Sequence, residues 1–159
     1  HHVWPSVYAV WHPLPTQDGR WLAAVLACGP GAALGYLSAA VLWGVWERGV
    51  PARLDVCVPT RCGRTGPAGV SIHRTELPPE DVTVRHAIPV TTLPRTLIDL
   101  GGRLESRHLR SALRQAERLH RLVDPTGRSA LDRLATAAEL VRYAPPGRAS
   151  GTGLVEDFF

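Results

Sequence analysis

The sequence contains no methionine and no lysine. Without methionine, His1 cannot be an initiator residue, so we expect it to lie inside a longer reading frame or to follow processing. The apolar pattern of Leu154 to Phe159 stops without a helix cap, so we expect the natural chain to continue there too. All 18 basic residues are arginine, and glycine, proline and alanine are abundant, as is typical of a high-GC bacterium.

Cysteine is scarce as well. Cys28, Cys57 and Cys62 are odd in number and lack the paired spacing of zinc ligands. Their number and spacing therefore indicate neither a disulfide framework nor a structural metal. We therefore expect a reducing, cytoplasmic compartment and no cofactor. The net charge of +4 and a pI near 9.5 are compatible with a polyanionic partner such as DNA.

Charge is absent from one long stretch, Trp21 to Trp46. A run of this length exceeds the roughly 20 apolar residues that span a bilayer. Gly29-Pro30-Gly31 divides it, however, and lipid offers no partner for the backbone groups that such a break exposes. We favour a pair of buried helices over a membrane hairpin, and no signal peptide is visible.

The patterns predict an α+β fold, because the 45% apolar content suits a folded core and strand-like runs precede helical ones. Its sheet is expected to be small and antiparallel or mixed, packed with an N-terminal helix pair and a C-terminal run of three helices. Leu77-Pro78-Pro79 is expected to be a non-helical connector. The predicted strands are Val7–Val10, a hairpin of Leu54–Val58 with Val70–Thr75, Val82–Arg85 and Ile88–Thr91. The predicted helices are Arg20–Cys28, Leu34–Trp46, 93–100 after a Thr91 or Thr92 cap, Ser106–Leu122 and Ser129–Tyr143.

Motifs for catalysis are missing. Gly29, Gly31 and Gly35 do not match a dinucleotide fingerprint, and no Gly-x-Ser-x-Gly occurs. The acids Glu76, Glu80 and Asp81 lie in a proline-rich connector, where solvated surface is the favoured interpretation over a metal site. Histidines without zinc spacing are expected to be structural or exposed: His12, His73, His86, His108 and His120. We therefore predict no catalytic residue and no metal ligand, and thus a chain that is not itself an enzyme.

A basic stripe is the feature with chemical content. Its arginines recur at steps of three and four, which places them on one side of a helix opposite Leu109 and Leu113. The stripe consists of Arg107, Arg110, Arg114, Arg118 and Arg121. Contact with phosphates and an ordinary solvated face are both open interpretations. Arg61 and Arg64, in the loop of the predicted hairpin, are weaker candidates of the same kind.

Several strings together resemble the AbiEi-type antitoxins of bacterial type IV toxin-antitoxin systems, and the resemblance covers nearly the whole chain. The strings are Val7-Tyr8-Ala9-Val10 with His12-Pro13, 20–31, Ser38-Ala39-Ala40 with Leu42-Trp43-Gly44, Val56-Cys57-Val58-Pro59, 72–75, 77–84, and 88–92 with 95–100. No single string is diagnostic, but their order and spacing are jointly specific.

The resemblance implies three parts. Residues 1–12 look like the remnant of a winged-helix wing, 13–144 like the antitoxin C-terminal domain, and 145–159 like a linker that opens a missing domain similar to very-short-patch-repair endonucleases. Relatives of this kind support transcriptional autoregulation and oppose a nucleotidyltransferase toxin. One departure is Gly35-Tyr36-Leu37, where relatives commonly show Ser-His-Arg, and this puts any binding role of that helix start in doubt.

Three functional hypotheses follow. The first is a non-catalytic, DNA-associated antitoxin-like regulator, with DNA and a toxin as expected partners and no membrane. The alternative is the positioning middle region of an endonuclease whose catalytic domain lies downstream. The third is a folded remnant without activity. The sequence predicts neither an operator nor an oligomeric state.

Overall fold

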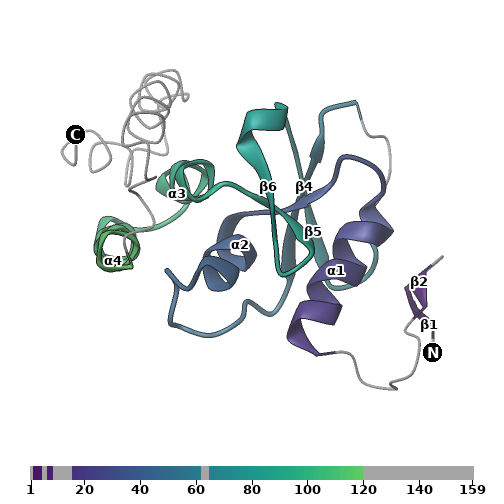
Figure 1. Cartoon of the computed structure of the whole chain (residues 1–159), viewed down its shortest axis with the longest axis horizontal. Coiled ribbons are helices and arrows are strands. Elements are labelled where there is room, and N and C mark those ends of the chain that lie inside the picture. Colours follow the sequence, from purple (N-terminus) through teal and green to yellow (C-terminus); the bar gives the residue numbers. More distant parts are fainter. Residues whose placement is uncertain (1, 5–6, 9–15, 62–64, 120–159) are drawn as a thin grey trace. The chain divides into compact units, whose positions relative to one another are not determined.

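The computed structural model describes residues 2–4, 7–8, 16–61 and 65–119 (Figure 1). The chain divides into two compact units. The first comprises 1–39 and 50–92, and the second comprises 40–49 and 93–159. The division falls inside helix α2 (Tyr36–Trp43). The chain therefore leaves the first unit, contributes a short segment to the second and returns before the first is complete.

A five-stranded mixed sheet forms the centre of the first unit and confirms the mixed α+β class. Its order is β5-β4-β3-β7-β6. The strands are β3 (Ala33–Leu34), β4 (Leu54–Pro59), β5 (Val70–Thr75), β6 (Val82–Arg85) and β7 (Ile88–Thr91). The β3–β4 and β6–β7 pairs are antiparallel, whereas the β4–β5 and β3–β7 pairs are parallel.

The hairpin predicted for Leu54–Val58 and Val70–Thr75 is wrong. β4 and β5 do pair, but in parallel, with Leu54 opposite Val70 and Pro59 opposite Thr75. The intervening residues 60–69 can span roughly 33 Å when extended, whereas a six-residue strand is only about 20 Å long. The chain can therefore return to the start of β5 without a helical crossover. Alternating apolar residues indicate a strand but carry no information about its direction.

The helix predicted for Leu34–Trp46 is also corrected at both ends. Leu34 belongs to β3, where it pairs with Val56 of β4 and Val90 of β7 and is fully buried. α2 begins at Tyr36 and ends at Trp43. A strand of two residues is too short to show the alternation that identifies strands, so the helical pattern that follows β3 was extended to include Leu34.

The two faces of the sheet differ in character. Leu34, Val56 and Val90 share one face through their register, and that face is aliphatic. Ala33 lies opposite Cys57, and Cys57 lies opposite His73, so the other face carries small and polar side chains. β4 is buried on both faces from Leu54 to Val58.

α1 (Gln17–Cys28) packs against β4 and β7. The Thr16 hydroxyl caps it by accepting a hydrogen bond from Gly19 N at 3.1 Å. Near the N-terminus, β1 (His2–Trp4) and β2 (Val7–Tyr8) form a separate antiparallel pair, which falls partly on the predicted strand Val7–Val10. Across the residues described, no helix is both long and apolar enough to cross a membrane.

Two connections in the first unit have unusual backbone conformations. Pro79–Asp81 forms a short 3₁₀ helix, η1, so the connector predicted to be non-helical is helical from its last proline onward. Proline is tolerated there because it occupies the first turn, where its missing N–H has no partner to lose. Between β6 and β7, His86 and Ala87 both have positive φ, at 50° and 62°. His86 Nδ1 also lies 3.0 Å from Asp18 Oδ2 at the start of α1.

The second unit contains the end of α2 together with α3 (Leu93–Gly101) and α4 (Ser106–Arg118). α3 agrees with the predicted helix 93–100, and it packs against α4. Both helices bury leucines at helical spacing, among them Leu97, Leu100, Leu109 and Leu113. The predicted helix Ser129–Tyr143 lies outside the described residues, as does the end of the predicted helix Ser106–Leu122.

Candidate nucleic-acid interface

α4 presents two opposite faces. Its buried face consists of Leu109, Ala112, Leu113 and Ala116, each at most 2% exposed. The arginines of the predicted stripe that fall within the helix, Arg107, Arg110, Arg114 and Arg118, are all exposed. Successive residues turn by about 100° along a helix, so steps of three and four keep these side chains in one strip. The predicted placement of the stripe on the outer face is confirmed for these four residues.

The two outer arginines of the strip are paired. Arg107 Nε lies 2.9 Å from Glu105 Oε2, which places an acid beside a basic residue in the first turn of α4. Arg118 Nη2 donates to Gln115 Oε1 and lies 3.6 Å from Glu47 Oε1. All of these ion-pair side chains are at least 66% exposed. The pairs therefore orient the side chains but contribute little to the stability of the fold.

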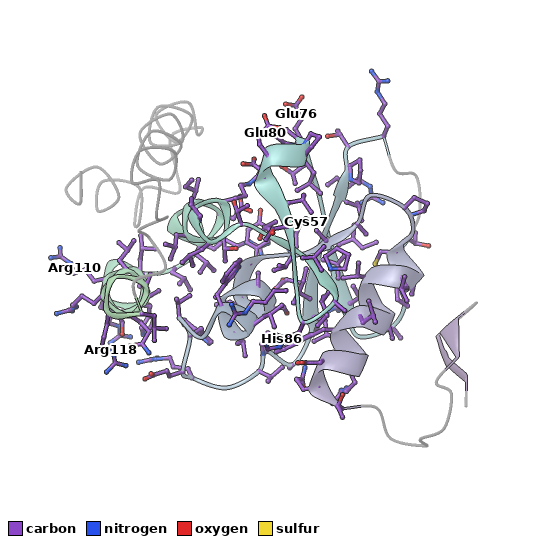
Figure 2. The ribbon with its side chains drawn as sticks, viewed as in Figure 1. Cys57, Glu76, Glu80, His86, Arg110 and Arg118 are labelled. Atoms are coloured by element: carbon purple, nitrogen blue, oxygen red, sulfur yellow. The ribbon has the colours of Figure 1, made fainter. Side chains whose placement is uncertain are left out.

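The two central arginines differ from the outer ones. Within the part of the chain that the structure describes, neither Arg110 nor Arg114 forms an ion pair or a side-chain hydrogen bond. Figure 2 shows Arg110 and Arg118 extending away from the ribbon of α4. Like charges one helical turn apart repel by tenths of a kcal/mol, and an anion placed between them removes that cost. This face is therefore suited to phosphate.

A second segment of the same unit approaches α4. α2 ends in a Schellman motif, in which Gly44 N bonds to Val41 O and Val45 N bonds to Ala40 O, each at 2.9 Å. Gly44 has a φ of 75°, a conformation that favours glycine. The turn buries Val45 and is followed by Trp46, Glu47 and Arg48.

Between this segment and α4 lies a hollow of about 360 Å³. One wall is formed by residues 45–48 and the other by Arg107, His108, Ser111, Ala112, Arg114 and Gln115. The Trp46 and His108 rings meet edge to face, with centroids 6.1 Å apart and planes at 83°. Gln115 Nε2 donates to Glu47 Oε1 at 2.8 Å across the hollow. His108 Nε2 is buried and has no hydrogen-bond partner among the residues that the structure describes.

Three arginines of the predicted site remain, namely Arg61, Arg64 and Arg121. Arg61 is exposed in the loop after β4, in the first unit. Arg64 and Arg121 lie outside the described residues. The sequence did not point to Trp46 or Arg48 as neighbours of the stripe, because about 60 residues separate the two walls of the hollow.

A buried polar pair in the first unit was missed as well. Asp55 Oδ1 lies 2.7 Å from His73 Nε2, with the two side chains only 10% and 12% exposed. The Ser38 hydroxyl accepts a hydrogen bond from Asp55 N at 2.9 Å, and the Tyr36 ring contacts the His73 ring at a tilt of 43°, with centroids 4.2 Å apart. Tyr36 has a φ of 46°, which a non-glycine residue adopts only when its surroundings hold it there.

This polar pair does not form a metal site. Over the residues the structure covers, no three His, Cys, Asp or Glu side chains are grouped closely enough to bind a metal ion. Cys28 and Cys57 are buried and form no disulfide. Of the acids in the connector, Glu76 and Glu80 are exposed and appear at the edge of the molecule in Figure 2. His86 is exposed, whereas His12 and His120 lie outside the described residues.

Comparison with known proteins adds no assignment, since no protein-family model and no curated protein matches this chain.

Proposed function

We propose that this chain is a non-catalytic, antitoxin-like regulatory domain that binds DNA through the exposed arginines of α4. The observation that carries the proposal is the pair Arg110 and Arg114, exposed side by side on a folded helix with no acidic partner among the described residues. Their side chains are separated by one helical turn, so both can reach phosphates of one backbone. The resemblance to AbiEi-type antitoxins supports a regulatory role and a nucleotidyltransferase toxin as a protein partner.

Backbone contacts of this kind give affinity without sequence preference. Each phosphate neutralised by an arginine releases counterions, so the logarithm of the association constant falls with the logarithm of salt by about 0.9 per contact. Guanidinium groups also bind phosphate through two parallel hydrogen bonds. We expect binding to several duplexes of one length with similar affinity, unless parts of the natural protein outside this chain add base contacts.

The test is the salt dependence of duplex binding by the whole chain and by a double variant, Arg110→Ala with Arg114→Ala. We expect the salt slope of the variant to fall by about 2 relative to the parent chain, because two phosphate contacts are lost. The matched control is Arg20→Glu, which removes the same two units of charge from the exposed surface of α1 in the first unit. Equal losses in the double variant and the control would show a net-charge effect and would contradict the proposal, as would no duplex binding at low salt.

A further inference from the structure

The hollow beside the arginine strip has features that phosphate contact does not use. Arg107 and Arg114 lie at its wall on α4, and Arg48 lies at the opposite wall. The aromatic rings of Trp46 and His108 also line the hollow. A ligand that only needed negative charge would gain nothing from these rings. The combination of guanidinium groups and an aromatic surface suits a planar group joined to phosphate.

The size of the hollow limits what can enter. About 360 Å³ is at the lower end of the range for small-molecule sites, so it admits one planar heterocycle with its substituents. It cannot admit a base pair within a duplex, because paired bases are stacked and covered on both faces. An unpaired base presents its face and its hydrogen-bonding edge together.

The polar groups of the hollow fit such a base. The His108 ring lines the wall on α4, although its Nε2 is buried and therefore not open to a ligand atom. Ser111 offers a hydroxyl on the same wall. The carboxylate of Glu47 accepts from Gln115 and faces Arg118, which lowers its repulsion of a bound phosphate.

We propose that the hollow binds one unpaired nucleobase, stacked on Trp46, while Arg48, Arg107 and Arg114 hold the flanking phosphates. The preferred ligand of the chain is then DNA with a single-stranded segment or end instead of a continuous duplex. This inference rests on the proposed function, because it uses the same arginine strip. The base site adds a second contribution to the binding free energy, beside the phosphate contacts. Base stacking on an aromatic ring tolerates different sequences and is largely independent of net charge.

The experiment compares three ligands of equal phosphate number on the whole chain: a single-stranded oligonucleotide, a blunt duplex, and a duplex with a single-stranded overhang. We expect the single strand and the overhang to bind more tightly than the blunt duplex. Trp46→Leu keeps apolar bulk but removes the aromatic face, and it is expected to weaken binding of the single strand and of the overhang duplex by about 10-fold, with no effect on the blunt duplex. Trp46→Phe is expected to restore most of that loss.

A second variant covers the case in which Trp46→Leu melts at a lower temperature than the parent chain. Ser111 is exposed on the wall of the hollow, so Ser111→Trp fills the space from its rim without disturbing the buried face of α4. The same selective loss of single-strand binding is expected. Equal weakening of all three ligands by both variants, or no weakening by either, overturns the inference. A polyglutamate peptide that competes as well as the oligonucleotide also overturns it, since the hollow would then recognise charge alone.

The two proposals fail in different ways. If the blunt duplex binds with the expected salt dependence but Trp46 and Ser111 have no effect on any ligand, the base site is wrong and the arginine interface stands. If none of the three ligands binds at low salt, the proposed function fails, and the base site fails with it.

Discussion

In the first unit, Asp55 and His73 are turned inward, 2.7 Å apart and almost covered, whereas in the second unit Arg110 and Arg114 are turned outward with no acidic partner in the described chain. The first arrangement satisfies two polar groups inside the fold, where an unsatisfied one would be costly. The second leaves charge available to another molecule. The buried pair of the first unit therefore contributes to its stability, whereas the arginines on α4 are the residues that we propose for binding.

The largest effect on the free energy of unfolding is expected from removing one member of the buried pair of Asp55 and His73. Asp55→Ala leaves His73 Nε2 without the carboxylate it contacts, in a place that is largely closed to water. We expect the free energy of unfolding to fall by about 3 kcal/mol. Denaturant unfolding of the variant measures this loss.

The control uses the second Asp–His pair of the same unit. Asp18 and His86 are also in contact, at 3.0 Å, but their side chains are 47% and 56% exposed. Asp18→Ala is expected to cost less than about 1 kcal/mol because water replaces the lost contact. Equal losses for Asp55→Ala and Asp18→Ala would mean that burial does not set the strength of these pairs.

A slightly smaller effect is expected at Gly35, which tests how closely β3 approaches β4. A methyl group at this position would collide with Cys57 Sγ on the small, polar face of the sheet. Gly35→Ala should therefore lower the free energy of unfolding by about 2 kcal/mol. In the double variant with Cys57→Ala, the nearest atom is the Cβ of residue 57 at 3.5 Å, which is an ordinary contact.

Because the added methyl group collides with the sulfur of Cys57, Gly35→Ala, Cys57→Ala and the double variant form a double-mutant cycle. The two substitutions should couple favourably, so that the double variant is more stable than the sum of the two single losses predicts. Strictly additive losses would show that Gly35 is required for a reason other than space for the sulfur.

A stabilising change is expected in the turn between β6 and β7. Ala87 has a φ of 62°, in the left-handed region that is unfavourable for a side chain. Ala87→Gly should raise the free energy of unfolding by about 1 kcal/mol, since the relieved strain exceeds the added entropy of the unfolded chain. The matched control is Ala52→Gly, an exposed position without positive φ, where we expect a small loss instead. A gain at both positions would contradict the explanation by backbone strain.

The smallest effect on stability is expected on α4. There we expect substitution of an arginine to weaken DNA binding while leaving the free energy of unfolding nearly unchanged. Arg110→Ala should change the free energy of unfolding by less than about 0.5 kcal/mol, because its exposed side chain forms no ion pair or hydrogen bond within the described fold. The same variant should weaken duplex binding and reduce the salt slope by about 1. A clear loss of stability without loss of binding would reverse the roles assigned to the two units.

The sequence was most informative where periodicity is long. The arginine strip and the buried leucines of α4 repeat over three turns, so both faces of the helix could be predicted. β3 has only two residues, so the strand at the centre of the sheet could not be predicted. The composition of β5 does not indicate its direction, so its parallel pairing with β4 could not be predicted either. Asp55 and His73 lie on neighbouring strands, and Trp46 and His108 lie about 60 residues apart in the chain, so neither contact follows from local pattern.

The order of segments along the chain limits how the protein can be dissected. Residues 40–49 belong to the second unit but are encoded between two parts of the first. A truncation after Thr92 would retain every strand of the five-stranded sheet, yet it would separate Val45 and Trp46 from the helix that forms the other wall of their hollow. A fragment that starts at Leu93 would keep the arginines and lose the tryptophan. Neither unit can be expressed intact as one continuous piece, so loss of the C-terminal helices should leave an apolar segment uncovered and prone to self-association.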